Sequence, residues 1–159
     1  MKTAAKSHSR DPQADYYDWL NRQARALRDK QPHYLDWREL AEELKETGAR
    51  ERRELVSHLR ILMAHLLKWS YQSSRRAVSW RRTILLARQE AEAVLTDSPS
   101  LKPMLAERVA KAYEDARRLA GTEMKLEPAA QERLFPQSCP WSLDELRDPD
   151  YLPERERRR

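Results

Sequence analysis

The stretch LVSHLRILMAHLLKW, residues 55–69, decides the fold class, because its apolar residues recur at the spacing of one helix face. Steps of four, three, four and three separate Leu55, Leu59, Leu62, Leu66 and Trp69. This is the spacing of a coiled-coil seam. Val56, Met63 and Leu67 widen the apolar surface beyond the seam. We therefore predict that this stretch is the central core helix of an all-α protein.

The composition also favours helices over sheets. The 159 residues include two glycines and few β-branched residues, whereas leucine and alanine supply most of the apolar mass. Strands and tight hairpins prefer the residues that are scarce here. Two glycines cannot build a glycine-rich phosphate loop, so nucleotide sites of that kind are excluded. At 40% hydrophobic residues the chain can bury a core, and its length indicates one domain.

Helical periodicity continues upstream of the central stretch. We expect a first helix from Asp11 or Asp15, with one apolar face: Tyr17, Leu20, Ala24 and Leu27. A second helix should start at Asp36, which would form a capping box with Glu39. Its apolar face would comprise Trp37, Leu40, Ala41 and Leu44. Gly48 leaves open whether residues 36–71 form one helix or two.

Two further helices are expected downstream. Ser79 should cap a third helix that has an apolar face of Trp80, Ile84, Ala87, Ala91 and Val94. Ser100 should cap a fourth helix, which Gly121 would close. A short helix can follow Pro128. The proline-rich end contains a capping box of Ser142 and Glu145, and three aromatic anchors: Phe135, Trp141 and Tyr151.

These elements predict a bundle of four main helices, with the proline-rich C-terminal segment wrapped over it. We expect a disordered N-terminal arm at residues 1–12, a single helical domain at 13–153, and a basic tail at 154–159. The single cysteine, Cys139, excludes an intrachain disulfide and favours a reducing compartment. It lies between Ser138 and Pro140 with no nearby histidine, so we expect a structural role. No apolar run approaches the ~20 residues of a membrane span. We therefore expect a cytoplasmic protein that makes no membrane contact.

The net charge of +5 is unevenly distributed. Residues 55–89, here called the basic band, contain seven basic residues and no acidic one. Arginines there alternate with Trp69, Tyr71 and Trp80, a composition that suits single-stranded nucleic acid. The candidate contacts are Lys68, Arg75, Arg76, Arg81 and Arg82. The alternative is that these cations pair with acidic residues of residues 36–54 or 144–150.

Several short strings point to a known family: HLLKW at 65–69, SWR at 79–81, DSPSL at 97–101, YEDA at 113–116, and the Phe-Pro and Cys-Pro pairs at 135–140. In this order they resemble the bacterial domain of unknown function family 29 (DUF 29), over roughly residues 15–153. The resemblance implies a compact all-helical domain. It implies no activity, because none is assigned to the family.

Two histidines are the candidates for chemistry. His58 and His65 lie about 10 Å apart along one helix, so a single metal ion cannot bind both without other ligands. Arg53 and Arg60 each precede a histidine by five positions, which is similar to the Arg-x(4–6)-His pattern of the HEPN ribonucleases. In an arginine-rich chain this match is close to chance. The structural alternative is that His65 bonds a carbonyl in the core and His58 pairs with Glu54.

The remaining cluster, Glu42, Glu43 and Glu46, is expected to be a solvated helix face. No pattern in the chain predicts a metal or a cofactor. We therefore expect a non-enzymatic protein-interaction or regulatory module that associates with itself or with a protein partner through a helical face. The basic band would be a secondary contact. The alternative is RNA or DNA binding, including a HEPN-like endoribonuclease or a toxin–antitoxin component.

Overall fold

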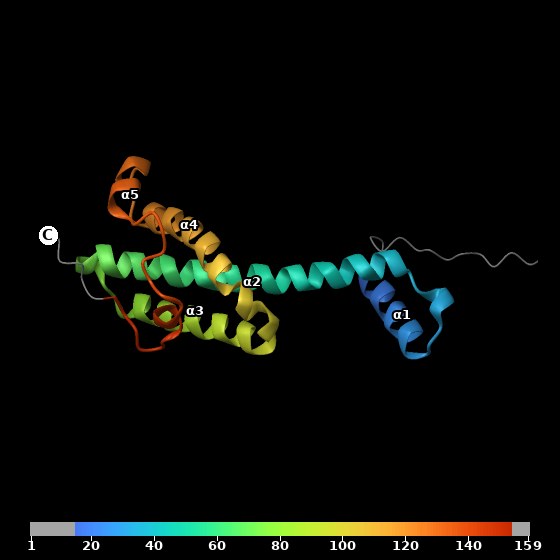
Figure 1. Cartoon of the computed structure of the whole chain (residues 1–159). Helices are drawn as coiled ribbons and strands as arrows, with labels where there is room; N and C mark the ends of the chain where they lie inside the picture. The colour runs from blue at the N-terminus through green and yellow to red at the C-terminus, as the bar shows by residue number, and fades with distance from the viewer. Residues whose placement is uncertain (1–14, 154–159) are drawn as a thin grey trace, which may run out of the picture. The chain divides into compact units, whose positions relative to one another are not determined.

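The computed structural model describes residues 15–153, and every regular element in them is helical (Figure 1). The α-helices are α1 (Tyr16–Arg28), α2 (Trp37–Tyr71), α3 (Val78–Asp97), α4 (Leu105–Glu123), α5 (Pro128–Leu134) and α6 (Leu143–Arg147). Three 3₁₀ segments lie between them: η1 (Pro32–Tyr34), η2 (Ser73–Arg75) and η3 (Pro99–Met104). The all-α class is confirmed. The predicted arm at 1–12 and tail at 154–159 lie outside the described residues.

The chain divides into two compact units, residues 1–48 and 49–159. Helix α2 begins in the first unit and runs without a break into the second. Residues 37–71 are therefore one helix, and Gly48 is a helical residue at the boundary between the units. The single domain and the four-helix bundle stay predictions.

In the N-terminal unit, α1 starts where Asp15 accepts a hydrogen bond from the Asp18 backbone N–H at 2.9 Å. Its buried residues are Trp19, Gln23 and Ala26. The predicted apolar face of α1 was therefore wrong, since Tyr17 is 77% and Leu27 51% exposed. Trp19 has the largest apolar surface on the helix and finds an acceptor for its indole N–H inside the unit, so its side of α1 is the one that is buried.

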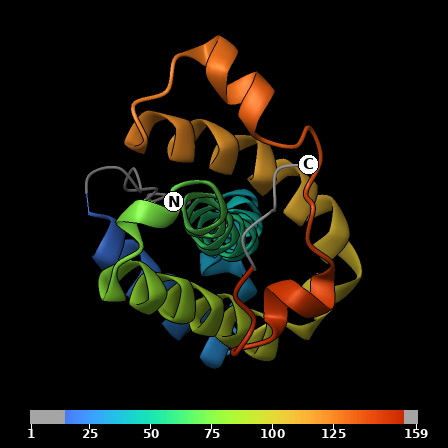
Figure 2. The same ribbon diagram turned by 90° about the vertical axis from the view of Figure 1, so that its left-hand side faces the viewer.

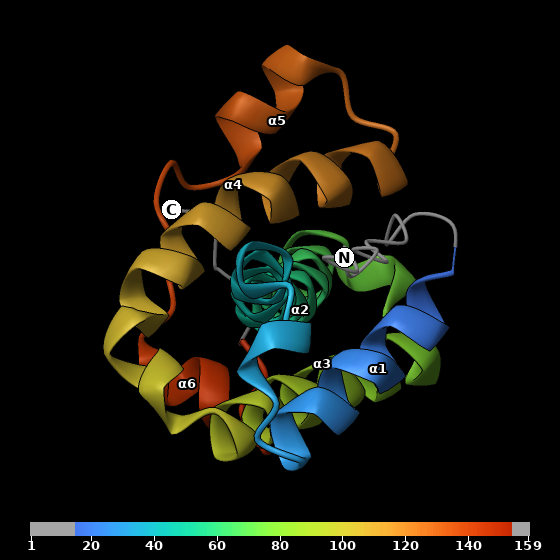
Figure 3. The same cartoon turned by 90° about the vertical axis from the view of Figure 1, so that its right-hand side faces the viewer.

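In the C-terminal unit, α3 and α4 lie on opposite sides of α2, as the two views along α2 show (Figures 2 and 3). The predicted seam is the centre of the core. Leu55, Leu59, Leu62 and Leu66 are buried, and Trp69 is partly buried against them. Helix α3 adds Ile84, Ala87, Ala91 and Val94 from its predicted face.

Three predicted helix boundaries were wrong. Helix α3 begins at Val78 with Ala77 at its N-cap, so Ser79 does not cap it. Ser100 does not cap α4, which begins only at Leu105. The chain before Leu105 forms the 3₁₀ segment η3, and Pro103 lies inside it. Gly121 lies within α4, and the left-handed turn falls on Lys125, at a φ of 58°.

The C-terminal segment is attached to α3 through Arg88. This buried guanidinium donates to three backbone carbonyls, those of Leu146 at 2.8 Å, Tyr151 at 3.1 Å and Pro149 at 3.2 Å. Burial lowers the pKa of Arg88, while Asp148 and Asp150 oppose that shift. The predicted capping box of Ser142 and Glu145 is confirmed at the start of α6. Two of the predicted anchors, Phe135 and Trp141, are buried, and Tyr151 is partly buried.

Candidate functional site

The interior of the N-terminal unit is a polar network built on a tryptophan. Trp19 Nε1 donates to Asp36 Oδ2 at 2.7 Å, and Gln23 Nε2 donates to the same oxygen at 3.1 Å. The Asp36 backbone N–H donates to Gln23 Oε1 at 2.8 Å. In a capping box Glu39 would take that N–H. The predicted capping box was therefore wrong, because Gln23 from α1 accepts the bond.

This network joins the two helices through their polar sides and leaves apolar side chains outside. We call Trp37, Leu40, Ala41 and Leu44 the apolar stripe of α2, and Tyr17, Leu20, Ala24 and Leu27 the apolar stripe of α1. Trp37 is 62% exposed and Leu44 is 72% exposed. They are seven residues apart and share a helix face. The sequence predicts both stripes as core faces, and the structure has neither of them buried.

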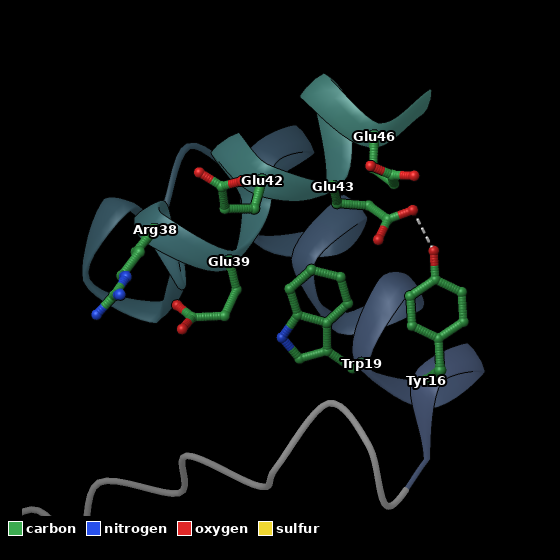
Figure 4. Close-up of a pocket in the computed structure, with 7 residues that line it drawn as sticks. All are labelled: Tyr16, Trp19, Arg38, Glu39, Glu42, Glu43 and Glu46. Atoms are coloured by element: carbon green, nitrogen blue, oxygen red, sulfur yellow. Dashed lines mark hydrogen bonds between the residues drawn. The ribbon is translucent and has the colours of Figure 1, made fainter. Parts of the chain in front are cut away.

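An acidic hollow lies on the other side of α2, where α1 approaches it (Figure 4). Its volume is about 610 Å³, and α2 lines it with Arg38, Glu39, Glu42, Glu43 and Glu46. Tyr16 and Trp19 line it from α1, and the Tyr16 hydroxyl donates to Glu43. The carboxylates that we expected to form a solvated face therefore border an aromatic-walled hollow.

The candidate nucleic-acid residues do not form one surface. Lys68 is buried, pairs with Glu123 at 2.5 Å, and lies 4.4 Å from the centre of the Trp80 ring. Arg76 donates to the Trp69 carbonyl at 2.9 Å and covers the Trp69 ring. The other three, Arg75, Arg81 and Arg82, are exposed, and none of them forms an ion pair with a residue of 15–153.

The contacts of the two histidines are those of the structural alternative, in which His65 bonds a carbonyl and His58 pairs with Glu54. His65 Nδ1 lies 3.0 Å from the Ile61 carbonyl, and burial lowers the pKa of His65. His58 Nε2 lies 3.7 Å from Glu54. These contacts are with a backbone carbonyl and a carboxylate. A catalytic role for the two predicted Arg–His pairs stays a prediction.

Cys139 contacts the core rather than a catalytic base. Its Sγ lies 3.5 Å from the Trp141 carbonyl and 3.7 Å from Met63 Sδ. Burial raises the pKa of the Cys139 thiol, which keeps it protonated and weakly nucleophilic. Among residues 15–153, no three His, Cys, Asp or Glu side chains are grouped to hold a metal ion. No helix in the same range is long and apolar enough to cross a bilayer.

A second concave site lies in the C-terminal unit between α2 and α4. We call it the basic cleft, and it is lined by Ala49, Arg52, Arg53, Val56, Arg108 and Lys111. Sequence reasoning missed it, because 55 residues separate Arg53 from Arg108 and no local pattern links them. Arg88 was also missed. The sequence pattern could have indicated that Arg88 is buried, since Arg88 lies next to Ala87 and four residues after Ile84 on the predicted apolar face of its helix.

One comparison with known proteins covers most of the chain. The family model described as "Domain of unknown function DUF29" matches residues 13–152. The chain belongs to the DUF29 family. The match covers almost the whole range over which the short strings of the sequence resemble that family. No curated protein matches this DUF29 chain, and no solved structure matches it either.

Proposed function

We propose that this DUF29 protein is a non-enzymatic protein-interaction module that docks through the apolar stripes of α1 and α2. The observation that carries the proposal is the exposure of Trp37 and Leu44, at 62% and 72%. Contiguous apolar surface that is exposed on a folded unit marks an interaction site. A large aromatic side chain such as Trp37 is the residue type that dominates binding energy at such sites. We place this function in the cytoplasm, as the single cysteine suggests.

We propose that the docked partner is a second copy of the chain. A hairpin of two helices cannot bury an outward stripe by itself, but two hairpins can enclose their stripes in a four-helix arrangement. Such a pair would be symmetric, with the same surface contributed by both copies. Residues 15–48 contain eight acidic and six basic residues, so repulsion between two copies is small.

Co-expression of two differently tagged copies tests this proposal. Capture through one tag should recover the other copy. The double substitution Trp37→Ser and Leu44→Ser should abolish the co-capture, because it removes the two large exposed side chains of the α2 stripe. The matched control is Leu85→Ser with Leu86→Ser, which removes two exposed leucines from α3 in the other unit. Co-capture should survive in the control. A wild-type chain that never captures its copy contradicts self-association.

Nucleic-acid binding is the second candidate, and one observation favours it. Arg75, Arg81 and Arg82 are exposed, and no carboxylate of residues 15–153 pairs with them. Phosphate contacts by these residues would make the affinity for a single-stranded oligonucleotide fall steeply with salt. Titration of a labelled oligonucleotide at low and high salt tests this. Binding that is absent, or that salt does not change, would contradict it.

A further inference from the structure

We propose that the basic cleft of the C-terminal unit binds the phosphate group of a small ligand. This site is separate from the docking stripes, which lie on residues of the N-terminal unit. It is also separate from the basic band, because none of Lys68, Arg75, Arg76, Arg81 or Arg82 lines it. The proposal is therefore independent of the proposed docking function.

Helical spacing gathers the cations of the cleft. Ala49, Arg52, Arg53 and Val56 follow one another at positions i, i+3, i+4 and i+7 of α2, so they occupy one face of that helix. Arg108 and Lys111 are three residues apart on α4 and face the same space. Ala49 and Val56 add short, uncharged side chains to the lining of the cleft.

The positive charge in the cleft is not neutralised by its own walls. No acidic residue lines it. Neither Arg52 nor Lys111 forms an ion pair with any residue that the structure describes. Arg108 has one carboxylate near it, that of its exposed neighbour Glu107 at 3.5 Å. Several like charges around one hollow repel one another, and a bound anion would remove that repulsion.

Arg108 also presents a polar atom without a partner. Its Nε is buried and forms no hydrogen bond within the described part of the chain. A buried donor without an acceptor costs free energy, and a ligand oxygen would relieve that cost. The guanidinium group offers parallel N–H donors whose spacing matches two oxygens of a phosphate. This donor geometry fits a phosphate or a carboxylate and not a neutral ligand. The four basic side chains of the cleft favour the phosphate, because it carries more negative charge than a carboxylate.

The size of the cleft favours a compact ligand. Its volume is about 320 Å³, near the lower end of the range of about 300–1,000 Å³ for small-molecule pockets. A phosphomonoester or a diphosphate fits such a space. We therefore assign the cleft to a small phosphate-bearing ligand rather than to the backbone of a nucleic acid.

Calorimetric titration of inorganic pyrophosphate into the full chain at low ionic strength tests the assignment. The test variant is Arg52→Gln with Lys111→Gln, and the control is Arg81→Gln with Arg82→Gln, which removes the same charge from the basic band. Glutamine is a good helix former, so neither double substitution should disturb its helix. Circular dichroism should show that each variant folds. A parallel titration uses a single-stranded oligonucleotide of mixed sequence.

Pyrophosphate should bind the wild-type chain and the control with similar affinity. The test variant should bind it at least roughly tenfold more weakly, since charge-assisted hydrogen bonds are lost. Absence of pyrophosphate binding, or equal weakening in both variants, would overturn the proposal. So would binding of the oligonucleotide without binding of pyrophosphate, which would assign the charge to nucleic acid instead.

Discussion

The indole N–H of Trp19 donates to the carboxylate of Asp36 at 2.7 Å, and this bond decides which sides of α1 and α2 face each other. Because the acceptor lies at the start of α2, the helices meet through Trp19 and Gln23 rather than through their apolar stripes. Trp37 and Leu44 are left exposed as a consequence. The proposed docking surface is thus the outer side of a hairpin that is held together from within by polar contacts.

Loss of the Asp36 acceptor should loosen the N-terminal unit. In Asp36→Ala the buried indole N–H and the Gln23 amide each lose a partner, which should cost the local stability about 2 kcal/mol. Hydrogen exchange of the α1 amides measures this directly. Asp29→Ala is the matched control, since Asp29 follows α1 and contributes backbone bonds at its C-cap. Equal exchange rates in the two variants would contradict the role given to Asp36.

Arg88 should be essential for attachment of the C-terminal segment. Arg88→Met keeps the buried aliphatic stem but leaves three carbonyls without their donor, so unfolding should become easier by about 3 kcal/mol or more. Arg82→Met, on the exposed side of the same helix, should change stability by less than about 0.5 kcal/mol. Denaturant unfolding compares the two. A small effect at Arg88 would contradict the role given to Arg88 and would leave the attachment to other contacts, such as the Arg147–Glu92 ion pair.

These two contacts mark the limit of what the sequence predicts. The seam from Leu55 to Leu66 was predicted correctly, because four leucines on one helix face are most stable when that face is buried. The stripes of α1 and α2 follow the same rule, yet none of their residues is buried, and Tyr17, Leu27, Trp37 and Leu44 are exposed. Periodicity shows that a face is apolar, but it does not show whether this chain or a partner covers it. In α1, the side that is buried is the side of Trp19, whose indole N–H finds an acceptor at Asp36, and not the side of the four-residue stripe.

The candidate sites show the same limit. The structural interpretations of His65 and His58 needed only contacts within one helical turn, and both contacts are present. The basic cleft joins two helices distant in sequence, and the Arg88 contacts join a helix to carbonyls near the C-terminus. Neither arrangement follows from spacing along the chain. The sequence predicts Lys68 as a contact for nucleic acid, but the fold places Glu123 beside it.

His65 should make the protein less stable in mild acid. Its folded-state pKa lies below the ordinary value of 6.5 because burial disfavours the charged ring. The unfolded chain therefore binds the proton more readily, so the stability is full above about pH 6.5 and falls as the pH drops below it. NMR titration of the ring should give a midpoint below 6.5, and His65→Gln should lose less stability between pH 7 and pH 5 than the wild type. A midpoint above 6.5 would contradict this account.

The apolar stripe of α2 should contribute little to the stability of one chain. Leu44→Ala removes a side chain that is 72% exposed, so it should change the free energy of unfolding by less than about 0.5 kcal/mol. Leu62→Ala removes a fully buried side chain from the same helix and should cost about 2–5 kcal/mol. Urea denaturation at a protein concentration low enough to disfavour association compares them. A large cost at Leu44 would mean that the residue belongs to a core of its own chain.

The molar mass of the wild-type chain in solution tests the central proposal most directly. Light scattering across a range of concentrations should approach twice the monomer mass of 18.9 kDa. The Trp37→Ser, Leu44→Ser variant should remain at 18.9 kDa under the same conditions. A wild-type mass of 18.9 kDa at every concentration, or a dimer that persists in the variant, would contradict docking through the α2 stripe.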